Sequence, residues 1–305
     1  MRILVLGATG FLGRHAADRL RALPGARVLG GGRGPGADVP VDLAAGDPAA
    51  LAEALRAAAP DTVVNCVGAV GGSALALTSL NAHAPAVLCE AVRRAAPDAR
   101  LVHLGSAGEY GPADGHRPVG EGHPARPLGL YGATKLAGTL AVTGSGLDAV
   151  VLRVFNPVGP GAPDASLPGR LAAELRKAGP DGRVRTGDLS AYRDFVDARD
   201  VAEAIACAVT APRPLPGVLN IGSGTARPVR DIAEGLLRAA GRGDHVGDRV
   251  DEDGDGSPRS AAVPWIQADI TAACRALDWA PRHSLEDSLA DLWAATGEPG
   301  AEAPG

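Results

Sequence analysis

Apolar runs of strand length alternate with helical patterns along the first half of the chain. The strand-length runs lie at residues 3–6, 28–29, 63–67, 101–104 and 150–155. Apolar residues at helical spacing occupy segments between them, at residues 11–23, 47–59, 75–95 and 130–141. Strands that follow one another through helices pair in parallel, and the helices cover both faces of the sheet. The pattern therefore predicts an α/β fold, a Rossmann-type doubly wound parallel sheet.

A glycine-rich turn joins the first predicted strand to the first predicted helix. Gly7, Gly10 and Gly13 recur there at three-residue spacing, where bare backbone can approach a pyrophosphate and a helix N-terminus offers N–H donors. Such glycines can also serve only turn geometry and close strand–helix packing. Their position after the first strand of an alternating pattern favours a dinucleotide site. The residues of this turn that we expect to bind the cofactor are Gly7, Thr9, Gly10, Phe11, Leu12 and Gly13.

The end of the second predicted strand bears on which dinucleotide binds. It runs into Gly31-Gly32-Arg33, where NAD-specific folds place an acidic residue for the ribose hydroxyls, and no acid stands there. The Arg33 guanidinium can instead pair with a 2′-phosphate, so we expect NADP(H) as the preferred cofactor and NAD(H) as the alternative. A solvated loop arginine is the competing interpretation. Asp42 and Leu43 are expected to hold the adenine edge, with an ordinary turn as the alternative.

The rhythm of elements changes after residue 157. Shorter elements follow in Pro- and Gly-rich sequence, with helices expected at residues 167–178, 198–210, 229–240, 270–277 and 285–295. We predict a dinucleotide-binding domain over residues 1–165, a smaller C-terminal substrate-binding lobe mainly over residues 166–295, and a flexible tail over residues 296–305. The segment 187–222 is expected to return to the first domain.

Charge and cysteine usage exclude several classes of function. Lys+Arg 30 against Asp+Glu 35, without a basic block, argues against a nucleic-acid partner. The four cysteines lie far apart with no C-x-x-C pair, so we expect neither disulfides nor zinc and a cytoplasmic location. The first apolar run is too short for a signal peptide, and no uncharged run approaches the roughly 20 residues of a membrane span. The acidic segment 251–256 lacks the bidentate Glu of a calcium loop, so no metal site is expected.

A tyrosine and a lysine stand four residues apart in the predicted helix 130–141. Tyr131 and Lys135 therefore lie on one helix face and can share one site. A phenol with a pKa of about 10 is a poor acid–base catalyst near neutrality unless a positive charge stabilises its phenolate, and Lys135 can supply that charge. Ser106 follows the fourth predicted strand, where its hydroxyl could hydrogen-bond the same substrate oxygen. An ordinary amphipathic helix is the alternative for the Tyr–Lys pair alone.

Taken in order, these residues resemble the extended short-chain dehydrogenase/reductase family over nearly the whole chain. Segments 153–160, 192–201 and 219–224 also look like signatures of that family. The resemblance implies that Tyr131 donates a proton, that Ser106 polarises the substrate oxygen, and that Lys135 lowers the pKa of Tyr131 and holds the nicotinamide ribose. It also places Phe155 beside the cofactor.

Within the family, segments 105–111, 189–195 and 259–264 are most similar to reductases of GDP-4-keto-6-deoxymannose. This resemblance implies a nucleotide-sugar pocket with Arg193 and Arg259 near the diphosphate and Asn156 near the sugar or nucleotide. Surface arginines are the alternative. The segment 65–72 departs from the family's usual form. Related sugar dehydratases carry an Asp-Glu pair directly after the catalytic hydroxyl residue, and Ala107-Gly108 stand here instead, so dehydration is not expected.

These features predict an NADPH-dependent reductase for the keto group of a nucleotide-activated 4-keto-6-deoxysugar. A nucleotide-sugar 4-epimerase that retains NAD is the nearest alternative, because it would use the same three side chains. A ketoreductase of a polyketide-like aglycone is a further alternative, since the fold does not set the substrate. A non-catalytic NADPH sensor is a third, but it would be expected to lose the catalytic residues. The expected partners are a small-molecule substrate and, as a homodimer, a second copy of the chain.

Overall fold

A parallel sheet of seven strands forms the centre of the computed structural model, which describes residues 1–113, 115–212, 214–243, 245–252 and 262–297. Its order is β11-β6-β5-β4-β1-β2-β3. The strands are β1 (Arg2–Leu6), β2 (Arg27–Gly32), β3 (Val39–Pro40), β4 (Thr62–Asn65), β5 (Arg100–Ser106), β6 (Ala149–Val154) and β11 (Val218–Ile221). The chain reverses its direction of travel between β1 and β4, and ligands of doubly wound sheets bind at the carboxyl ends beside such a point. The predicted fold class is confirmed.

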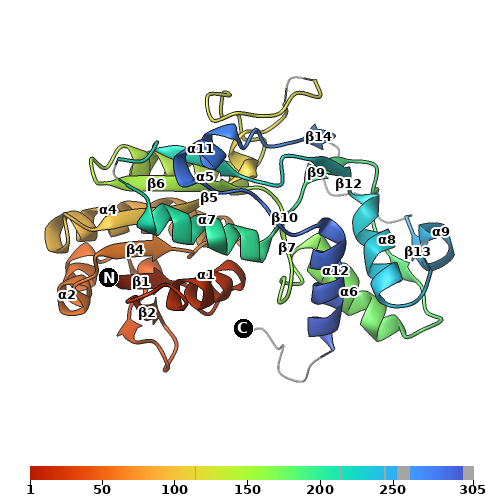
Figure 1. The fold of residues 1–305 in the computed structure, drawn as a ribbon, viewed down its shortest axis with the longest axis horizontal. Helices are drawn as coiled ribbons and strands as arrows, with labels where there is room; N and C mark the ends of the chain where they lie inside the picture. The colour runs from red at the N-terminus through yellow and green to blue at the C-terminus, as the bar shows by residue number, and fades with distance from the viewer. Residues whose placement is uncertain (114, 213, 244, 253–261, 298–305) are drawn as a thin grey trace.

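Helices cover both faces of the sheet (Figure 1). One face carries α1 (Phe11–Arg21), α7 (Ala198–Thr210) and α11 (Thr271–Leu277), and the other carries α2 (Pro48–Ala58), α4 (Ala84–Ala95) and α5 (Leu130–Thr143). Side chains alternate between faces along a strand. Val64 and Val102 accordingly pack under the first group, whereas Val63 and Leu101 pack under the second. Burial on both faces explains why these strands read as continuous apolar runs.

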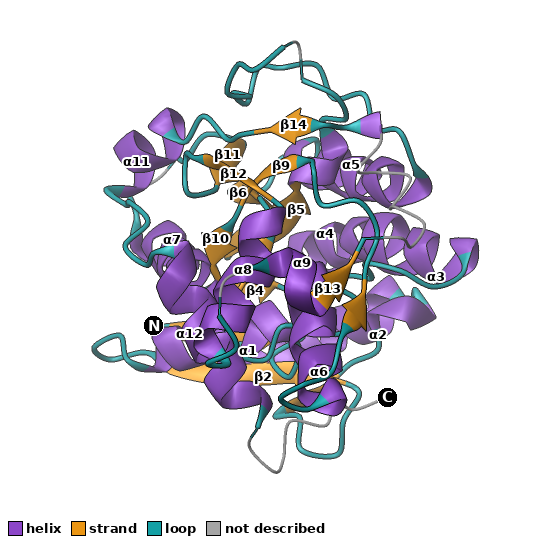
Figure 2. Ribbon diagram, turned by 90° about the vertical axis from the view of Figure 1, so that its right-hand side faces the viewer, coloured by secondary structure: helices purple, strands orange, loops and turns teal. Residues whose placement is uncertain are grey.

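A smaller lobe with its own apolar core lies beside the sheet, in front of it in Figure 2. Its helices are α6 (Leu167–Ala178), α8 (Arg230–Ala239), α9 (Val246–Arg249) and α12 (Leu285–Thr296). Short strands accompany them: β7 (Pro157–Val158), β8 (Val184–Arg185), β9 (Tyr192–Asp194), β10 (Val196–Asp197), β12 (Ala226–Pro228), β13 (Val250–Asp251) and β14 (Trp265–Ile266). β11 lies between lobe elements in sequence and yet pairs with β6 in the main sheet. The exact limits of the two parts stay a prediction, and residues 298–305 of the expected tail lie outside the described residues.

The segment expected as one helix over residues 75–95 is divided. It consists of α3 (Ala74–Thr78), a π-helical turn η2 (Ser79–His83) and α4. Asn81, inside the π turn, bonds both backbone groups of Ala69 at 2.8 Å. By length and composition the continuous stretch 74–95 could also span a membrane, although 50% of its apolar window is buried inside the structure. Core helices of globular proteins pass the same test, so this is a weak indication.

Candidate active site

The turn between β1 and α1 fits a dinucleotide. Gly7 has a φ of 77°, and a Cβ on Gly13 would lie 1.9 Å from the carbonyl oxygen of Gly7. No side chain fits at that position without moving backbone, so the turn stays bare. The N-cap residue Gly10 makes no side-chain capping bond, which leaves the helix N-terminus available to an anion. These features fit the pyrophosphate of NAD(P).

The other residues expected at this turn differ in exposure. Thr9 and Gly10 are exposed, and Phe11 and Leu12 are half-buried. Phe155 is fully buried, and its ring centroid lies 6.2 Å from that of Tyr110. Its side chain belongs to the core, so a cofactor contact there would come from its backbone.

No acid stands at the positions that end β2, but an acidic side chain from the following loop lies beside the strand. Asp38 Oδ2 accepts the backbone N–H of Gly30 at 2.8 Å. Asp38 lies six positions beyond the last residue of β2, so the residues at the strand end gave no sign of it. Pairing of β2 with β3, in which Gly31 faces Val39, brings the carboxylate back beside the strand. Arg33 is exposed just after β2.

The expected adenine contacts lie on a short 3-10 turn, η1 (Leu43–Ala45). Asp42 caps this turn by accepting the Ala44 N–H at 2.9 Å, and the Leu43 side chain is buried. The structure thus shows the local turn that was the alternative interpretation. A contact with adenine stays a prediction.

Ser106, Tyr131 and Lys135 converge at the carboxyl end of β5. The Tyr131 hydroxyl donates to Ser106 Oγ at 3.2 Å, and Lys135 Nζ donates to the carbonyl of Leu104 at 2.5 Å. Ser106 ends β5, whereas Tyr131 and Lys135 lie in the first turns of α5, one helical turn apart. The end of β5 therefore lies beside the start of α5, and the four-residue spacing places Tyr131 and Lys135 on the same face of that helix.

Burial is the main influence on the pKa values of the titratable groups in this cluster. Burial lowers the pKa of Lys135 to about 8, while the negative charges of Glu109 and of an ionised Cys66 would act to raise it. Burial raises the pKa of the Cys66 thiol to about 12, so Cys66 is neutral near pH 7. Burial also holds the pKa of His103 well below its usual value. Lys135 is thus largely protonated at neutral pH and faces two neutral neighbours and one carboxylate.

Two further residues belong to this cluster and were not singled out from the sequence. Glu109 is fully buried and bonds the Ser106 backbone N–H at 2.8 Å. Asn81 Nδ2 approaches Thr134 Oγ1 at 3.3 Å, next to Lys135. The Ser-x-x-Glu spacing of Ser106 and Glu109 is a capping-box signature that could have shown the first of these. Nothing local in the sequence indicated the π turn that carries Asn81.

The residues expected to contact substrate meet at β9. Arg193 is buried and donates to the carbonyl of Tyr192 at 2.7 Å, and Asn156 Nδ2 donates to the carbonyl of Asp194 at 2.8 Å. The buried Asp194 carboxylate accepts N–H groups of Ser223 (2.6 Å), Gly224 (3.0 Å) and Ala268 (3.0 Å). Burial raises the pKa of Asp194, and these hydrogen bonds oppose that rise. Arg259, the other expected diphosphate contact, lies outside the described residues.

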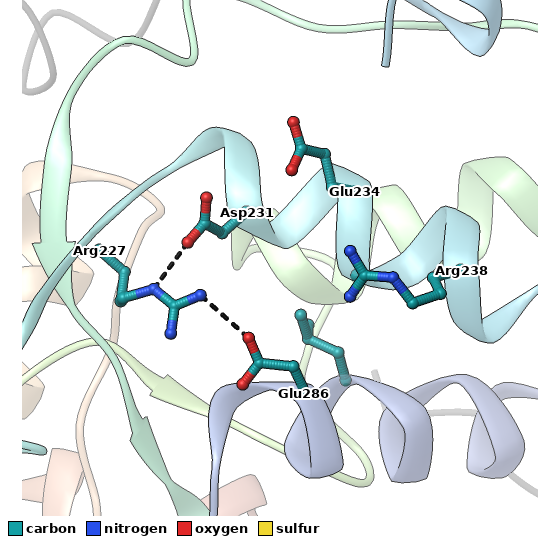
Figure 3. Close-up of a pocket in the computed structure, with 7 residues that line it drawn as sticks. Arg227, Asp231, Glu234, Arg238 and Glu286 are labelled. Atoms are coloured by element: carbon teal, nitrogen blue, oxygen red, sulfur yellow. Dashed lines mark hydrogen bonds and ion pairs between the residues drawn. The ribbon is translucent and has the colours of Figure 1, made fainter. Parts of the chain in front are cut away.

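A separate charged pocket lies in the lobe between α8 and α12 (Figure 3). Arg227 bonds Asp231 at 2.7 Å and Glu286 at 2.9 Å, so these lining charges satisfy one another. Glu234 and Arg238 complete the charged lining. None of its lining residues belongs to β5 or α5, which carry the Ser–Tyr–Lys cluster. We therefore interpret it as a structural ion-pair cluster between two helices.

The sequence matches a family model, NAD dependent epimerase/dehydratase, over residues 3–222. The chain belongs to this family. It is accordingly an enzyme of the NAD(P)-dependent oxidoreductase type, a member of the extended short-chain dehydrogenases/reductases.

Curated relatives and solved structures agree with this assignment. A dTDP-6-deoxy-L-talose 4-dehydrogenase (NAD(P)(+)) of Kitasatospora kifunensis is 39% identical over 312 aligned residues, 96% of this chain and 95% of its own. A UDP-glucose 4-epimerase of Streptomyces lividans is 33% identical over 215 residues, 64% of this chain and 61% of its own. MoeE5 in complex with UDP-glucose and NAD has a TM-score of 0.81 and 28% identity, covering 97% of this chain and 98% of its own. RMD from Pseudomonas aeruginosa complexed with NADPH, at 22% identity and a TM-score of 0.82, covers 97% and 98% and shares the fold.

Proposed function

We propose that the protein reduces the 4-keto group of a nucleotide-activated 6-deoxysugar, with NADPH as the preferred hydride donor. The observation that carries this proposal is the Tyr131–Ser106 hydrogen bond of 3.2 Å beside the buried Lys135, at the carboxyl end of a dinucleotide-binding sheet. The 39% identical relative supports the substrate class, because oxidation at C4 of dTDP-6-deoxy-L-talose is the reverse of 4-ketone reduction.

The three side chains divide the acid–base work. A bound reduced nicotinamide supplies a hydride to the carbonyl carbon. Tyr131 donates its phenolic proton to the carbonyl oxygen, so that the ketone becomes an alcohol and the phenol a phenolate, which solvent then reprotonates. Ser106 Oγ donates a hydrogen bond to the same oxygen and polarises it. The charge of Lys135 stabilises the phenolate, and its ammonium group is placed to bind the nicotinamide ribose.

Residues at β9 are proposed to hold the substrate's diphosphate. A guanidinium at Arg193 offers paired donors to phosphate oxygens, and Arg259 would join it. Asn156 lies next to β9 through its bond to Asp194 and would bind the sugar or nucleotide. The network around Asp194 supports this role because it holds β9 against two neighbouring loops.

Cofactor preference would result from two opposing charges near β2. The exposed Arg33 has room to approach a 2′-phosphate, whereas the Asp38 carboxylate beside Gly30 would repel it. We therefore propose a preference for NADPH that still permits use of NADH. The name of the 39% identical relative, with NAD(P)(+), is in keeping with dual use.

A substrate screen tests the proposal against its alternatives. NADPH oxidation should be measured with GDP-, dTDP- and UDP-linked 4-keto-6-deoxysugars and with several aromatic ketones. Turnover of at least one nucleotide sugar is expected. Activity on the ketones alone would reject the sugar substrate and favour the aglycone ketoreductase. Interconversion of C4 epimers without net NADPH consumption would show a 4-epimerase, a function named for several relatives. NADPH binding without turnover of any substrate would favour a sensor.

The cysteines bear on the location of the protein. The four cysteines are free thiols in the structure, which suits the reducing cytoplasm. We propose a cytoplasmic homodimer, and light scattering during gel filtration would measure the assembly directly.

A further inference from the structure

Glu109 closes the turn that presents Ser106. Its Oε1 accepts the Ser106 backbone N–H at 2.8 Å, while Ser106 Oγ accepts the Gly108 N–H at 3.1 Å. The two bonds form a reciprocal capping box around η3 (Ala107–Glu109). The hydroxyl proposed to polarise the substrate therefore sits in a turn whose backbone is held by a carboxylate.

The Glu109 carboxylate is fully buried and is paired behind the turn. Its Oε2 accepts Arg153 Nε at 2.7 Å, and the Arg153 guanidinium lies 4.6 Å from the centroid of the Tyr110 ring. Tyr110 in turn donates to Asn220 Oδ1 at 2.7 Å. Burying a charge without a partner is costly, and the ion pair with Arg153 offsets that cost.

Lys135 contacts the same stretch of β5 from its other end. Its Nζ bonds the Leu104 carbonyl at 2.5 Å, so Lys135 and Glu109 hold the peptide groups on either side of Gly105. Space at Gly105 is closed, since a Cβ there would lie 2.8 Å from Glu109 Oε1. The ammonium group of Lys135 and the carboxylate of Glu109, both buried, thus fix the backbone of residues 104–106 by hydrogen bonds.

We propose that Glu109 is a positioning residue of the active site, which orients Ser106 and supplies a buried negative charge that favours the charged form of Lys135. The proposal rests on the proposed catalytic roles of Ser106 and Lys135. Nothing in those roles assigns a function to Glu109 itself.

The titratable groups around Lys135 determine in which direction its pKa moves when Glu109 loses its charge. These groups are Tyr131 on its own helix, Cys66 after β4, His103 on β5 and Glu109 on η3. His103 and Cys66 are neutral near pH 7, as described above, and the carboxylate of Glu109 raises the pKa of Lys135. Loss of that carboxylate removes its attraction for the ammonium group, so Lys135 should lose its proton at lower pH.

Lysine NMR can test this directly, because the sequence contains two lysines, Lys135 and Lys177. With ¹³C at the lysine ε carbon, each gives one signal, and Lys177→Arg assigns them. In the wild type we expect Lys135 to titrate near a pKa of about 8. In Glu109→Gln its pKa should fall by about half a unit or more, while the exposed Lys177 is unchanged. An unchanged Lys135 titration in folded Glu109→Gln would overturn the proposal.

Glu109→Asp distinguishes the positioning of Ser106 from the supply of negative charge to Lys135. It also tests the proposal if Glu109→Gln does not fold. The shorter side chain retains the charge but withdraws it from the Ser106 N–H. Lys135 should then titrate within a few tenths of a unit of wild type, while kcat falls about tenfold with little change in KM. A wild-type kcat in Glu109→Asp would overturn the positioning of Ser106, and a large fall in the Lys135 pKa would overturn the charge role.

Asp148→Asn is the control for loss of a partly buried ion pair elsewhere on β5. Asp148 bonds Arg100 at 3.0 Å at the opposite end of β5 from Ser106. This variant should lower the melting temperature without moving the Lys135 titration or the pH profile of kcat/KM, and an equal shift in the control would overturn the specific role of Glu109. The titration needs neither substrate nor cofactor, so it tests the charge role of Glu109 even if the proposed reductase activity fails.

Discussion

At the scale of single residues, the proposed catalytic groups Lys135 and Ser106 are held by contacts that leave a donor free. Lys135 bonds the carbonyl of Leu104 with one of its three donor positions. Ser106 Oγ receives the Gly108 N–H and the Tyr131 hydroxyl, and its own proton stays available to a substrate oxygen. Removal of one functional atom should therefore change the chemistry far more than the stability.

Tyr131→Phe tests the proton donor. The ring stays in place without its hydroxyl, so NADPH binding should be nearly unchanged while kcat falls by about 10²–10⁴-fold, the usual cost of losing a general acid. Steady-state kinetics and a fluorescence titration with NADPH measure the two quantities. A kcat close to that of wild type would remove Tyr131 from the reaction.

The pH dependence of reduction should follow Lys135. Burial brings its pKa from the ordinary 10.5 to about 8, so the charge is present below that pH and is lost as pH rises through it. We expect kcat/KM to fall on the alkaline side of about pH 8. Lys177→Arg is the control and should leave the profile unchanged. A profile that stays flat for a full unit above the Lys135 pKa would contradict this role.

Cofactor choice should respond in opposite directions to two substitutions near β2. Arg33→Ala should weaken NADPH binding by about tenfold and should change NADH binding little. The effect on NADPH is smaller than the loss of a buried charge-assisted hydrogen bond would give, because Arg33 is exposed. Asp38→Asn should raise the NADPH to NADH ratio, because it removes a negative charge near the expected phosphate. Dissociation constants for both cofactors decide the matter. If the ratio of the NADPH and NADH dissociation constants is the same in the wild type and both variants, neither Arg33 nor Asp38 lies near the adenosine ribose of the cofactor.

At the scale of elements, the β1–α1 turn shows how backbone space sets function. Gly13→Ala would place a methyl group 1.9 Å from the Gly7 carbonyl oxygen, so the turn must open. We expect a loss of NADPH affinity of at least about tenfold together with lower thermal stability. Gly36→Ala is the matched control, since a Cβ there meets no atom within 4 Å. Wild-type affinity in Gly13→Ala would show that the turn does not hold the pyrophosphate.

Element prediction worked where periodicity was local. The helix 198–210 agrees with α7 (Ala198–Thr210), and that at residues 167–178 agrees with α6 (Leu167–Ala178). It failed at the π turn around Asn81, because the side chain bonds a loop residue, Ala69, twelve positions earlier. The two-residue strands of the lobe were also missed, since such short pairings have no period of their own.

At the scale of the whole molecule, the proposed substrate contacts come from two parts of the structure, the main sheet and the strands beside the lobe. Asn156 follows β6 of the main sheet, whereas Arg193 belongs to β9 beside the lobe, and Asp194 joins them through its backbone carbonyl. The arrangement predicts that sugar-nucleotide binding and cofactor binding can be weakened separately.

Arg193→Ala tests this separation. Loss of a charged hydrogen bond of about 1.5–3 kcal/mol should raise the Kd for a nucleotide sugar by roughly ten- to a hundred-fold, with NADPH affinity nearly constant. Calorimetric titration with each ligand measures both. Unchanged nucleotide-sugar affinity would reject Arg193 as a diphosphate ligand. Thermal unfolding of the variant is the control for a general loss of structure.

The sequence by itself determined the features that depend on short spacing. Alternating strands and helices predicted the sheet, three glycines predicted the dinucleotide turn, and the four-residue spacing of Tyr131 and Lys135 placed both on one helix face. Tertiary structure alone decided the contacts between distant segments. Strand register carries Asp38 back to Gly30, and packing of β5 against β6 pairs Glu109 with Arg153, 44 residues apart. Such contacts depend on how whole elements dock, and no local pattern of residues encodes that docking.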